Sequence, residues 1–297
     1  MTTTRRGFVM SSMAAGAAVP DASPLLPTVR FGRHEVTRLI LGSNPLFGYS
    51  HMSQNLDLAM REWMTLERRV ETVLRAERAG INAWQLHYHN DSMAMLDPLR
   101  ERGSKIQMFL LSDFELHKDF SMIPAVAKRG FIGMAHHGNR TDEAFRARDM
   151  SRVKEFVLRV KDTGLMAGVS AHNPDALDYI ENAGWPTDYY MTCFYNVSRT
   201  VEETRAVLGG EAPLGEAFLE KDPERMTRFV RQTRKPCLGF KVLGAGHRAR
   251  RRDGIAEAFR FAYAHIKPGD AIIVGMFPRY RDEVAENADL ARAALKA

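Results

Sequence analysis

The feature of this sequence that most constrains its fold is a regular alternation of short apolar runs with longer amphipathic stretches. The apolar runs have the length of buried strands, and the stretches between them carry apolar residues at helical spacing. The runs predict strands at residues 38–42, 82–87, 106–112, 131–135, 166–171, 188–194, 237–241 and 271–275. The stretches predict helices near residues 67–79, 92–102, 121–128, 148–163, 175–183, 222–234, 253–267 and 280–295. Strict alternation implies a parallel sheet, and eight such units close into a (β/α)8 TIM barrel.

One domain accounts for the whole predicted barrel. The chain has 297 residues, of which 45% are hydrophobic, and about 250 residues is the usual size of a single barrel of this kind. A short hairpin around Gly32 precedes the first strand. We therefore predict an α/β fold with one domain over residues 28–297. Two long loops, at residues 43–66 and 195–221, are candidate lids, and the first of them has room for a short helix.

Residues 1–27 are predicted to be a leader and linker that take no part in the fold. Arg5 and Arg6 are followed by a small, uncharged and apolar stretch that ends near Val19. This pattern resembles a twin-arginine signal peptide, which implies recognition by the twin-arginine export machinery. The stretch is shorter than the roughly 20 apolar residues of a membrane helix. We expect a mature chain without an integral membrane segment, in the periplasm or secreted.

Charge and cysteine content narrow the choice of partner and redox state. The chain carries 42 basic and 36 acidic residues, and this mixed charge does not favour nucleic acid as a partner. Its two cysteines, Cys193 and Cys237, are too few for a disulfide framework and fall near opposite ends of neighbouring predicted strands. We expect both to be free thiols.

Polar side chains gather where the predicted strands end. Barrel enzymes hold their active sites at the carboxyl ends of their strands, so these residues are candidates for a site. The candidates for catalysis are His87, Asp113, His136, His137, His172, Tyr195 and Lys241. The candidates for substrate binding are Asn44, Gln85, Tyr88, Asn139, Asn173 and Asn196.

Two chemistries fit this group, and the sequence leaves both open. Imidazoles with a carboxylate bind divalent zinc, manganese or iron, and the metal ligands would then be His87, Asp113, His137 and His172. Without a metal, the histidines would act as general acid and base, Asp113 would tune a neighbour, and Lys241 or Tyr195 would stabilise negative charge. Aromatic residues beside the predicted rim favour a sugar-like small molecule as the substrate.

Several segments, taken in order, resemble the aldo/keto reductase superfamily. They are the hairpin with residues 36–42, and residues 79–84, 168–173, 242–246, 273–276 and 283–287. The resemblance covers residues 28–297 and implies a barrel whose floor is plugged by the hairpin. It also implies a NAD(P) site over the seventh and eighth strands, where this chain has Gly244, Gly246, Arg279 and Arg281.

The catalytic tetrad that the resemblance implies is mostly absent. The family's aspartate falls on Gln85, its tyrosine on Asn90, its lysine on Asp113 and its histidine on His136. Reduction of a ketone by hydride needs a proton donor, and an asparagine does not donate a proton at neutral pH. The resemblance therefore implies the fold without the family's usual chemistry.

We therefore expect an exported aldo/keto reductase-like barrel enzyme that acts on a sugar or related carbonyl compound. Its chemistry would be acid–base or metal-assisted, as in a lyase, isomerase, epimerase or hydrolase. The first alternative is a NAD(P)-dependent oxidoreductase with a tightly bound cofactor, because twin-arginine export moves folded proteins with their cofactors in place. The second is a non-catalytic barrel that binds a carbohydrate or a partner protein. Such a barrel has less reason to gather ionisable groups on one rim.

Overall fold

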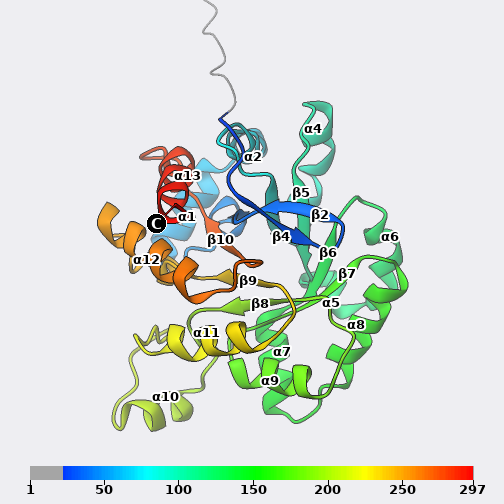
Figure 1. The fold of residues 1–297 in the computed structure, drawn as a ribbon, viewed down its shortest axis with the longest axis vertical. Helices are drawn as coiled ribbons and strands as arrows, with labels where there is room; N and C mark the ends of the chain where they lie inside the picture. The colour runs from blue at the N-terminus through cyan, green and yellow to red at the C-terminus, as the bar shows by residue number, and fades with distance from the viewer. Residues whose placement is uncertain (1–22, 297) are drawn as a thin grey trace, which may run out of the picture.

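A computed structural model describes residues 23–296 of the chain, and most of the predicted leader lies outside this range. Eight parallel strands form a closed barrel in the order β10-β3-β4-β5-β6-β7-β8-β9 (Figure 1). The strands are β3 (Leu39–Gly42), β4 (Ala83–His87), β5 (Gln107–Leu111), β6 (Gly133–His136), β7 (Met166–Ala171), β8 (Tyr189–Cys193), β9 (Cys237–Phe240) and β10 (Ala271–Gly275). The predicted (β/α)8 barrel is confirmed.

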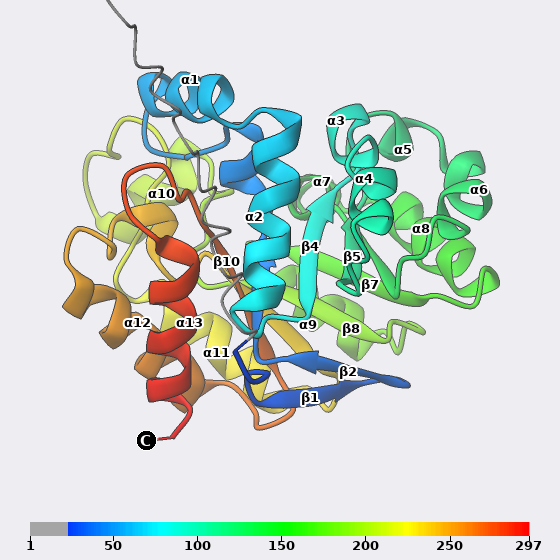
Figure 2. The same cartoon turned by 90° about the horizontal axis from the view of Figure 1, so that it is seen from above.

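A hairpin closes one end of the barrel. Strands β1 (Thr28–Phe31) and β2 (His34–Thr37) pair antiparallel and lie across the amino ends of the barrel strands (Figure 2). Gly32 makes the turn with φ of 59°, a left-handed conformation that glycine adopts without strain. The Phe31 ring enters the barrel and makes edge contacts with Phe109 and Tyr189, at centroid distances of 5.6 and 6.4 Å. This end is the floor, so a site is left at the carboxyl ends of the strands.

The strands divide two apolar cores. Alternate strand residues, among them Ile40, Ala135 and Met191, point inward and fill the barrel together with the hairpin. The intervening residues face outward and pack under the helices in the larger core. Both faces of the strands are buried, which is why their sequences are nearly continuous apolar runs.

The helices surround the barrel. They are α1 (Gln54–Trp63), α2 (Leu66–Arg78), α3 (Asn90–Met93), α4 (Leu96–Glu101), α5 (Phe114–Lys118), α6 (Ile123–Ala127), α7 (Gly138–Arg146), α8 (Ser151–Asp162), α9 (Pro174–Asn182), α10 (Val201–Leu208), α11 (Asp222–Gln232), α12 (Arg252–His265) and α13 (Glu283–Ala294). Short 3-10 turns are η1 (Asn44–Phe47), η2 (Phe120–Met122) and η3 (Gly244–Gly246).

Some details differ from the sequence-based expectation, and others agree with it. The stretch predicted as one helix near residues 92–102 is two short helices, α3 and α4. Helix α7 follows β6 directly and was not expected, because its sequence GNRTDEAFR carries few apolar residues. Of the two long loops, the second carries α10, while the first carries η1 and α1, in line with the helix it had room for.

The two cysteines are free, as expected, and both are buried, at the end of β8 and the start of β9. Within residues 23–296, no helix has the length and apolar character needed to cross a membrane.

Candidate functional site

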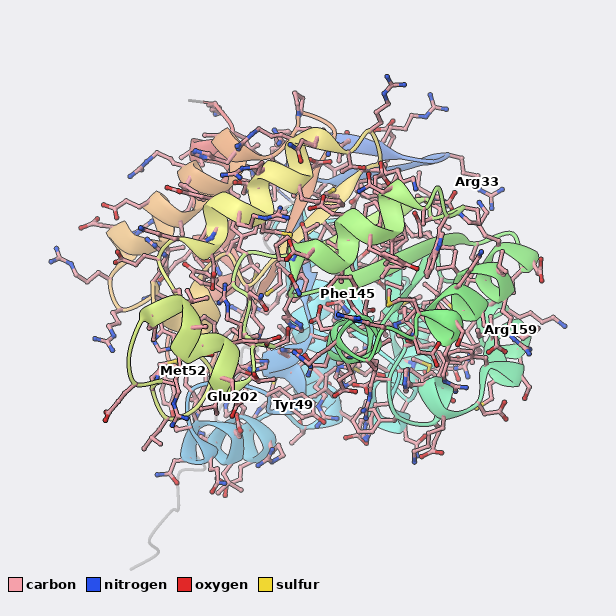
Figure 3. The ribbon with its side chains drawn as sticks, turned by 90° about the horizontal axis from the view of Figure 1, so that it is seen from below. Arg33, Tyr49, Met52, Phe145, Arg159 and Glu202 are labelled. Atoms are coloured by element: carbon pink, nitrogen blue, oxygen red, sulfur yellow. The ribbon has the colours of Figure 1, made fainter. Side chains whose placement is uncertain are left out.

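A cavity of about 490 Å³ lies at the carboxyl ends of the strands. Its lining includes seven predicted site residues: Asn44, Gln85, His137, Asn139, His172, Lys241 and Gly246. An eighth, Arg281, lines the part near β10, where the wall is mostly apolar and includes Leu56, Met60 and Val274. Figure 3 shows Tyr49 and Met52, which also line the cavity, near α1 and α10, while Arg33 on the hairpin lies at the other end of the molecule.

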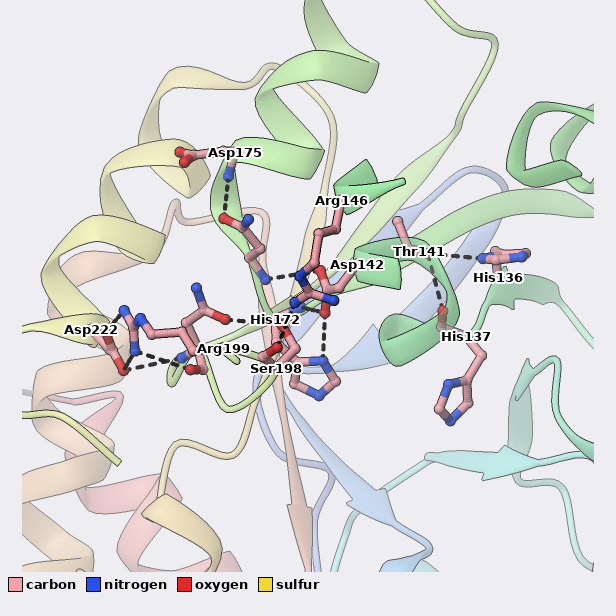
Figure 4. Close-up of polar contacts among 12 residues, drawn as sticks. His136, His137, Thr141, Asp142, Arg146, His172, Asp175, Ser198, Arg199 and Asp222 are labelled. Carbon is pink, nitrogen blue, oxygen red and sulfur yellow. Dashed lines mark hydrogen bonds and ion pairs between the residues drawn. The ribbon is translucent and has the colours of Figure 1, made fainter. Parts of the chain in front are cut away.

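A buried carboxylate orients one of the histidines on this cavity. The Oδ2 atom of Asp142 lies 2.9 Å from Nδ1 of His172 and also accepts the backbone N–H of His172 at 3.0 Å (Figure 4). Its Oδ1 atom accepts the backbone N–H of Asn173 at 3.0 Å. Both side chains of the pair are buried. The carboxylate favours the tautomer with the proton on Nδ1, and this leaves Nε2 of His172 as a base for the cavity.

Sequence reasoning missed Asp142. It lies in the first turns of α7, where an acidic residue on a polar stretch is usually solvated. Its burial, at 2% exposure, comes from α7 packing against the end of β7. One sequence feature could have indicated Asp142 as a site residue: it lies five residues after His137, a histidine at the end of a predicted strand.

His137 forms a second carboxylate pair at the mouth. Its Nε2 atom lies 3.7 Å from Oδ2 of Asp113, and Oγ of Ser112 accepts its backbone N–H at 3.1 Å. Burial lowers the pKa of His137, while the Asp113 charge opposes that shift. Among the described residues its Nδ1 atom has no hydrogen-bond partner although it is buried. His137 is therefore mainly neutral at pH 7, with one ring nitrogen unused.

Lys241 follows the last residue of β9 and lines the cavity. Its backbone has φ of 54°, a left-handed conformation that is uncommon for a residue with a side chain. Its Nζ atom is buried, and no residue in the described part of the chain bonds to it. Burial lowers the pKa of this ammonium, against smaller opposing effects of Cys193 and Glu216.

His87 lies in an aromatic box beside the cavity rather than on its lining. The rings of Phe47 and Tyr49 contact it edge-on, with centroid distances of 4.8 and 5.5 Å. Nδ1 of His87 lies 3.4 Å from Oγ of Ser43, which does line the cavity. Burial lowers the pKa of His87 to about 4, with the Asp113 charge opposing. His87 is therefore neutral at physiological pH.

The two long loops meet over the mouth. Nδ1 of His51, from the first loop, lies 3.0 Å from Oε1 of Glu216, from the second. Nε2 of His51 also lies 3.1 Å from Nδ2 of Asn44. Burial would raise the pKa of Glu216, but the hydrogen bond from His51 and the charge of Lys241 lower it below its usual value. The two loops predicted as lids are therefore in contact with each other at the cavity.

Several predicted site residues lie outside the main cavity. For two of them, the alternation of side chains along a strand explains this position. His136 and Tyr88 each follow an inward-facing strand residue, so both face the helix layer. His136 is buried against Phe120 and Phe156, and its Nδ1 atom lies 2.8 Å from Oγ1 of Thr141. Figure 4 shows the rings of His136 and His137 pointing in different directions. His136 is therefore outside the cavity.

The other predicted site residues outside the main cavity bond to neighbouring structural groups or line a second cavity. Tyr195 is buried, and its hydroxyl accepts a hydrogen bond of 2.8 Å from Nε of Arg248. Asn173 caps α9. Asn173 and Asn196 line a second cavity of about 270 Å³, which shares His172 with the first.

The residues expected to hold NAD(P) are divided. Gly246 and Arg281 line the main cavity, and Arg281 also pairs with Glu286 at 2.5 Å. Gly244 is the first residue of η3 and is buried close to the Tyr195 ring. The Arg279 side chain donates to the backbone oxygen of Ala59 at 3.2 Å and lies outside the cavity lining. Of the four residues expected to bind NAD(P), two, Gly246 and Arg281, therefore line the cavity.

The predicted metal ligands are not assembled into a metal site. Across residues 23–296, no group of three or more histidine, cysteine, aspartate or glutamate side chains is arranged to hold a metal ion. His87 sits in its aromatic box and Asp142 occupies Nδ1 of His172. The donor set His87, Asp113, His137 and His172 therefore does not fit a metal in this structure.

Comparison with known proteins defines the class of fold. No family model and no curated protein matches the chain. An aldo-keto reductase from Bacillus halodurans, AKR11C1 in its holo form, matches with a TM-score of 0.58 and 11% identity, covering 92% of this chain and 91% of that one. A truncated 3-deoxy-D-arabino-heptulosonate 7-phosphate synthase from Thermotoga maritima matches with a TM-score of 0.52 and 14% identity, over 92% and 90%.

A third similar structure was solved with a nicotinamide cofactor. It is a point mutant of Gox0644 in complex with NADPH, with a TM-score of 0.56, 12% identity and coverage of 89% and 88%. At these identities the likeness is one of fold alone. The chain is a (β/α)8 barrel of the kind that includes aldo-keto reductases.

Proposed function

We propose that this protein is an exported enzyme that removes and returns a proton beside the carbonyl group of a sugar or related carbonyl compound. The observation that carries the proposal is the buried pair of Asp142 and His172 on a cavity that also holds Lys241 and His137. A histidine oriented by a carboxylate is a common general base. The reaction class is then isomerisation, epimerisation or elimination.

Each residue has a role that its surroundings support. Nε2 of His172 takes the proton from the carbon next to the carbonyl, and Asp142 stabilises the imidazolium that forms. The negative charge that develops on the carbonyl oxygen needs positive charge or hydrogen-bond donors. Lys241 supplies positive charge, and His137 has a neutral ring with an N–H to donate. Returning the proton to a different position or face completes the reaction.

Deuterium exchange tests this proposal directly. The mature protein is incubated in D2O with a panel of ketoses, aldoses and 3-keto glycosides, and proton NMR follows the C–H signals beside each carbonyl. We expect exchange on at least one compound, and a loss of about 10²-fold or more in the variant His172→Asn. The variant His34→Asn, on the hairpin at the floor, is the matched control and should retain the wild-type rate.

The outcome also separates other functions. A hydrolase releases product without exchange, and a binding-only barrel retains a ligand without turnover. Absence of exchange and isomerisation across the panel would contradict the proposal.

A second candidate is a NAD(P)-dependent oxidoreductase. It is favoured by the extension of the cavity toward Gly246 and Arg281, where the family resemblance implies the cofactor. Fluorescence titration with NADPH should then give micromolar binding that weakens in Arg281→Ala. Because Arg281 also pairs with Glu286, the variant Glu286→Gln is the control for loss of that pair. No binding by the wild-type protein would remove this candidate.

Export rests on the leader sequence alone. Changing Arg5 and Arg6 together to Lys should hold the protein in the cytoplasm, because the twin-arginine receptor reads the arginine pair. Cell fractionation of the wild type and the double variant measures this. Unchanged delivery of the variant to the periplasm would contradict the twin-arginine assignment.

A further inference from the structure

We propose that Lys241 is a covalent nucleophile, whose amine condenses with the carbonyl group of the substrate to form a Schiff base at the mouth of the barrel. This inference rests on the proposed function, because it specifies how the same cavity activates the carbonyl. The substrate class it implies is an aldehyde or ketone with a removable proton on the adjacent carbon. In such an adduct the protonated imine accepts the electron pair that His172 sets free.

The first argument is the unpartnered amine. Burying an ammonium group without hydrogen bonds is costly, so buried lysines normally have partners. Two other partly buried lysines flank the amino ends of β9 and β10, at the floor, and both obey this rule. Nζ of Lys235 lies 3.0 Å from the Trp185 carbonyl oxygen and 2.7 Å from Thr187 Oγ1.

Nζ of Lys267 donates to the Val230 carbonyl at 2.6 Å and to Asp270 at 2.9 Å. Nζ of Lys241 has no such contact with any residue the structure describes. The amine can therefore move into the adjoining cavity without breaking a hydrogen bond.

The second argument is the backbone of Lys241. Its φ of 54° is a conformation that costs of order 1–3 kcal/mol for a residue other than glycine, and such strain gathers at functional sites. The carbonyl oxygen of Lys241 accepts the backbone N–H of Gly244 at 2.7 Å, which holds the turn. The turn directs the chain from β9 toward η3 while Lys241 stays on the cavity.

The third argument is the protonation state. Only a neutral amine attacks a carbonyl, and burial lowers the pKa of Lys241, which raises the neutral fraction. Cys193 offers no anion to hold the ammonium, because burial raises the pKa of its thiol and keeps it protonated. The apolar side chains of Met191 and Phe240 also line this part of the cavity. A lysine in an apolar pocket is the usual form of a Schiff-base nucleophile.

The chemistry balances without an oxidant or reductant. The nitrogen lone pair forms the C–N bond, the carbonyl π pair moves to oxygen, and a proton transfers from nitrogen to that oxygen. A second proton on the hydroxyl lets it leave as water, which produces the protonated imine.

The second proton comes from solvent, because the lowered pKa of Glu216 keeps this carboxylate, which lines the same cavity, ionised. Hydrolysis after proton transfer restores the free amine.

Reductive trapping tests the proposal. The mature protein is mixed with dihydroxyacetone, or with any compound that exchanges deuterium, and then treated with sodium cyanoborohydride. Peptide mass mapping should locate one reduced adduct on Lys241, formed at least about tenfold faster than on any other lysine. The variant Lys241→Arg keeps the positive charge and should lose both the adduct and the activity. The matched variant Lys235→Arg should retain both, and thermal unfolding verifies that each variant is folded.

Each outcome bears on one or both proposals. Deuterium exchange that survives in Lys241→Arg, or adducts scattered over surface lysines, would overturn the covalent role and leave the acid–base function standing. Trapping at Lys241 without exchange in the wild type would support the nucleophile and contradict the proton-transfer function. Neither trapping nor exchange would overturn both.

Discussion

At the floor of the barrel, the buried charged side chains have hydrogen-bond partners, although the hydroxyl of Tyr189 has none, whereas several ionisable groups at the mouth lack a partner in the described part of the chain. Asp270, at the floor, accepts the backbone N–H of Cys237 and of Lys267, each at 2.8 Å, and pairs with the Lys267 ammonium at 2.9 Å. At the mouth, buried nitrogen atoms of His87, His137 and Lys241 have no partner among residues 23–296. Lone polar groups of this kind cost folding free energy.

Strained backbone conformations are also found mainly at the mouth of the barrel rather than at its floor. Five non-glycine residues of the described range 23–296 have positive φ, and three of them, His51, Lys241 and Ala245, line the main cavity. Phe114, another of the five, packs against His87 and His89 beside the cavity. From this contrast we infer that the floor contributes mainly to stability. At the mouth, strained residues and unpaired polar groups remain available to bind a ligand. Variants at matched positions in the two regions can break or sharpen this comparison.

The largest effect is expected for Asp142→Asn at the mouth. The carboxylate accepts the two N–H groups of His172 through one oxygen and the backbone N–H of Asn173 through the other, whereas an amide has a single acceptor oxygen and places an NH2 group against the remaining donor. The charge and geometry that hold the proton of His172 on Nδ1 are therefore lost. We expect the rate of deuterium exchange to fall by about 10²- to 10³-fold. The cost in stability should be smaller than that of the floor variant described next. Exchange kinetics and thermal unfolding of the same preparation measure both quantities.

The floor variant Asp270→Asn should show the reverse pattern. It removes the charge that pairs with Lys267 and weakens the bond to Cys237, so it should destabilise the fold by about 2–4 kcal/mol. Activity per folded molecule should remain that of the wild type. Urea unfolding and activity at low temperature test this. If Asp270→Asn lost activity while keeping its stability, the division between floor and mouth would be wrong.

The third prediction concerns acid sensitivity at the mouth. The unfolded chain protonates His87 below about pH 6.5, whereas in the folded protein burial lowers the pKa of His87 to about 4. The unfolded state therefore binds the proton first as pH falls. Stability that is fully present above pH 6.5 is lost progressively down to pH 4, by about 3 kcal/mol from this one residue.

The variant His87→Phe, which suits the aromatic box, should lose less stability than the wild type between pH 7 and pH 4.5. Urea unfolding at the two pH values measures the difference. A residual loss is expected, because burial also lowers the pKa of His117 and His136. Equal losses in wild type and variant would show that His87 is accessible to protons in the folded state.

The fold was predictable because it depends on a pattern repeated along the whole chain. Each barrel strand lies within two residues of its predicted bounds, since parallel strands buried on both faces are distinct apolar runs. The hairpin was predictable from a local turn. The polar helix α7 was not, because its stability comes from packing against β7 rather than from an amphipathic sequence.

The candidate site was predictable only in part. Strand order correctly brought His137, His172 and Lys241 to one cavity. Period-two alternation continues to the strand ends and places His136 and Tyr88 on the outer face of the barrel, so these two candidates were wrong. Asp142 depends on the placement of an unexpected helix, and the contact between His51 and Glu216 joins residues 165 positions apart through two loops. No local pattern encodes such contacts.

The smallest effect is expected for His51→Asn. This variant removes the contact between the two long loops, at residues 43–66 and 195–221, and leaves the cavity residues beneath them unchanged. His51 has φ of 57°, and asparagine tolerates this conformation better than most residues, so the backbone should be retained. The shorter side chain loses the contacts with Glu216 and Asn44. Since the His51 and Glu216 side chains are 29% and 37% exposed, the stability should change by less than about 1 kcal/mol. Looser lids should raise KM about threefold to tenfold with kcat nearly unchanged, and proteolysis near Gly209 and Gly215 in the second loop should become faster. If neither KM nor the rate of proteolysis changed, the two loops would be rigid parts of the mouth, and the unused polar groups beneath them would be open to substrate at all times.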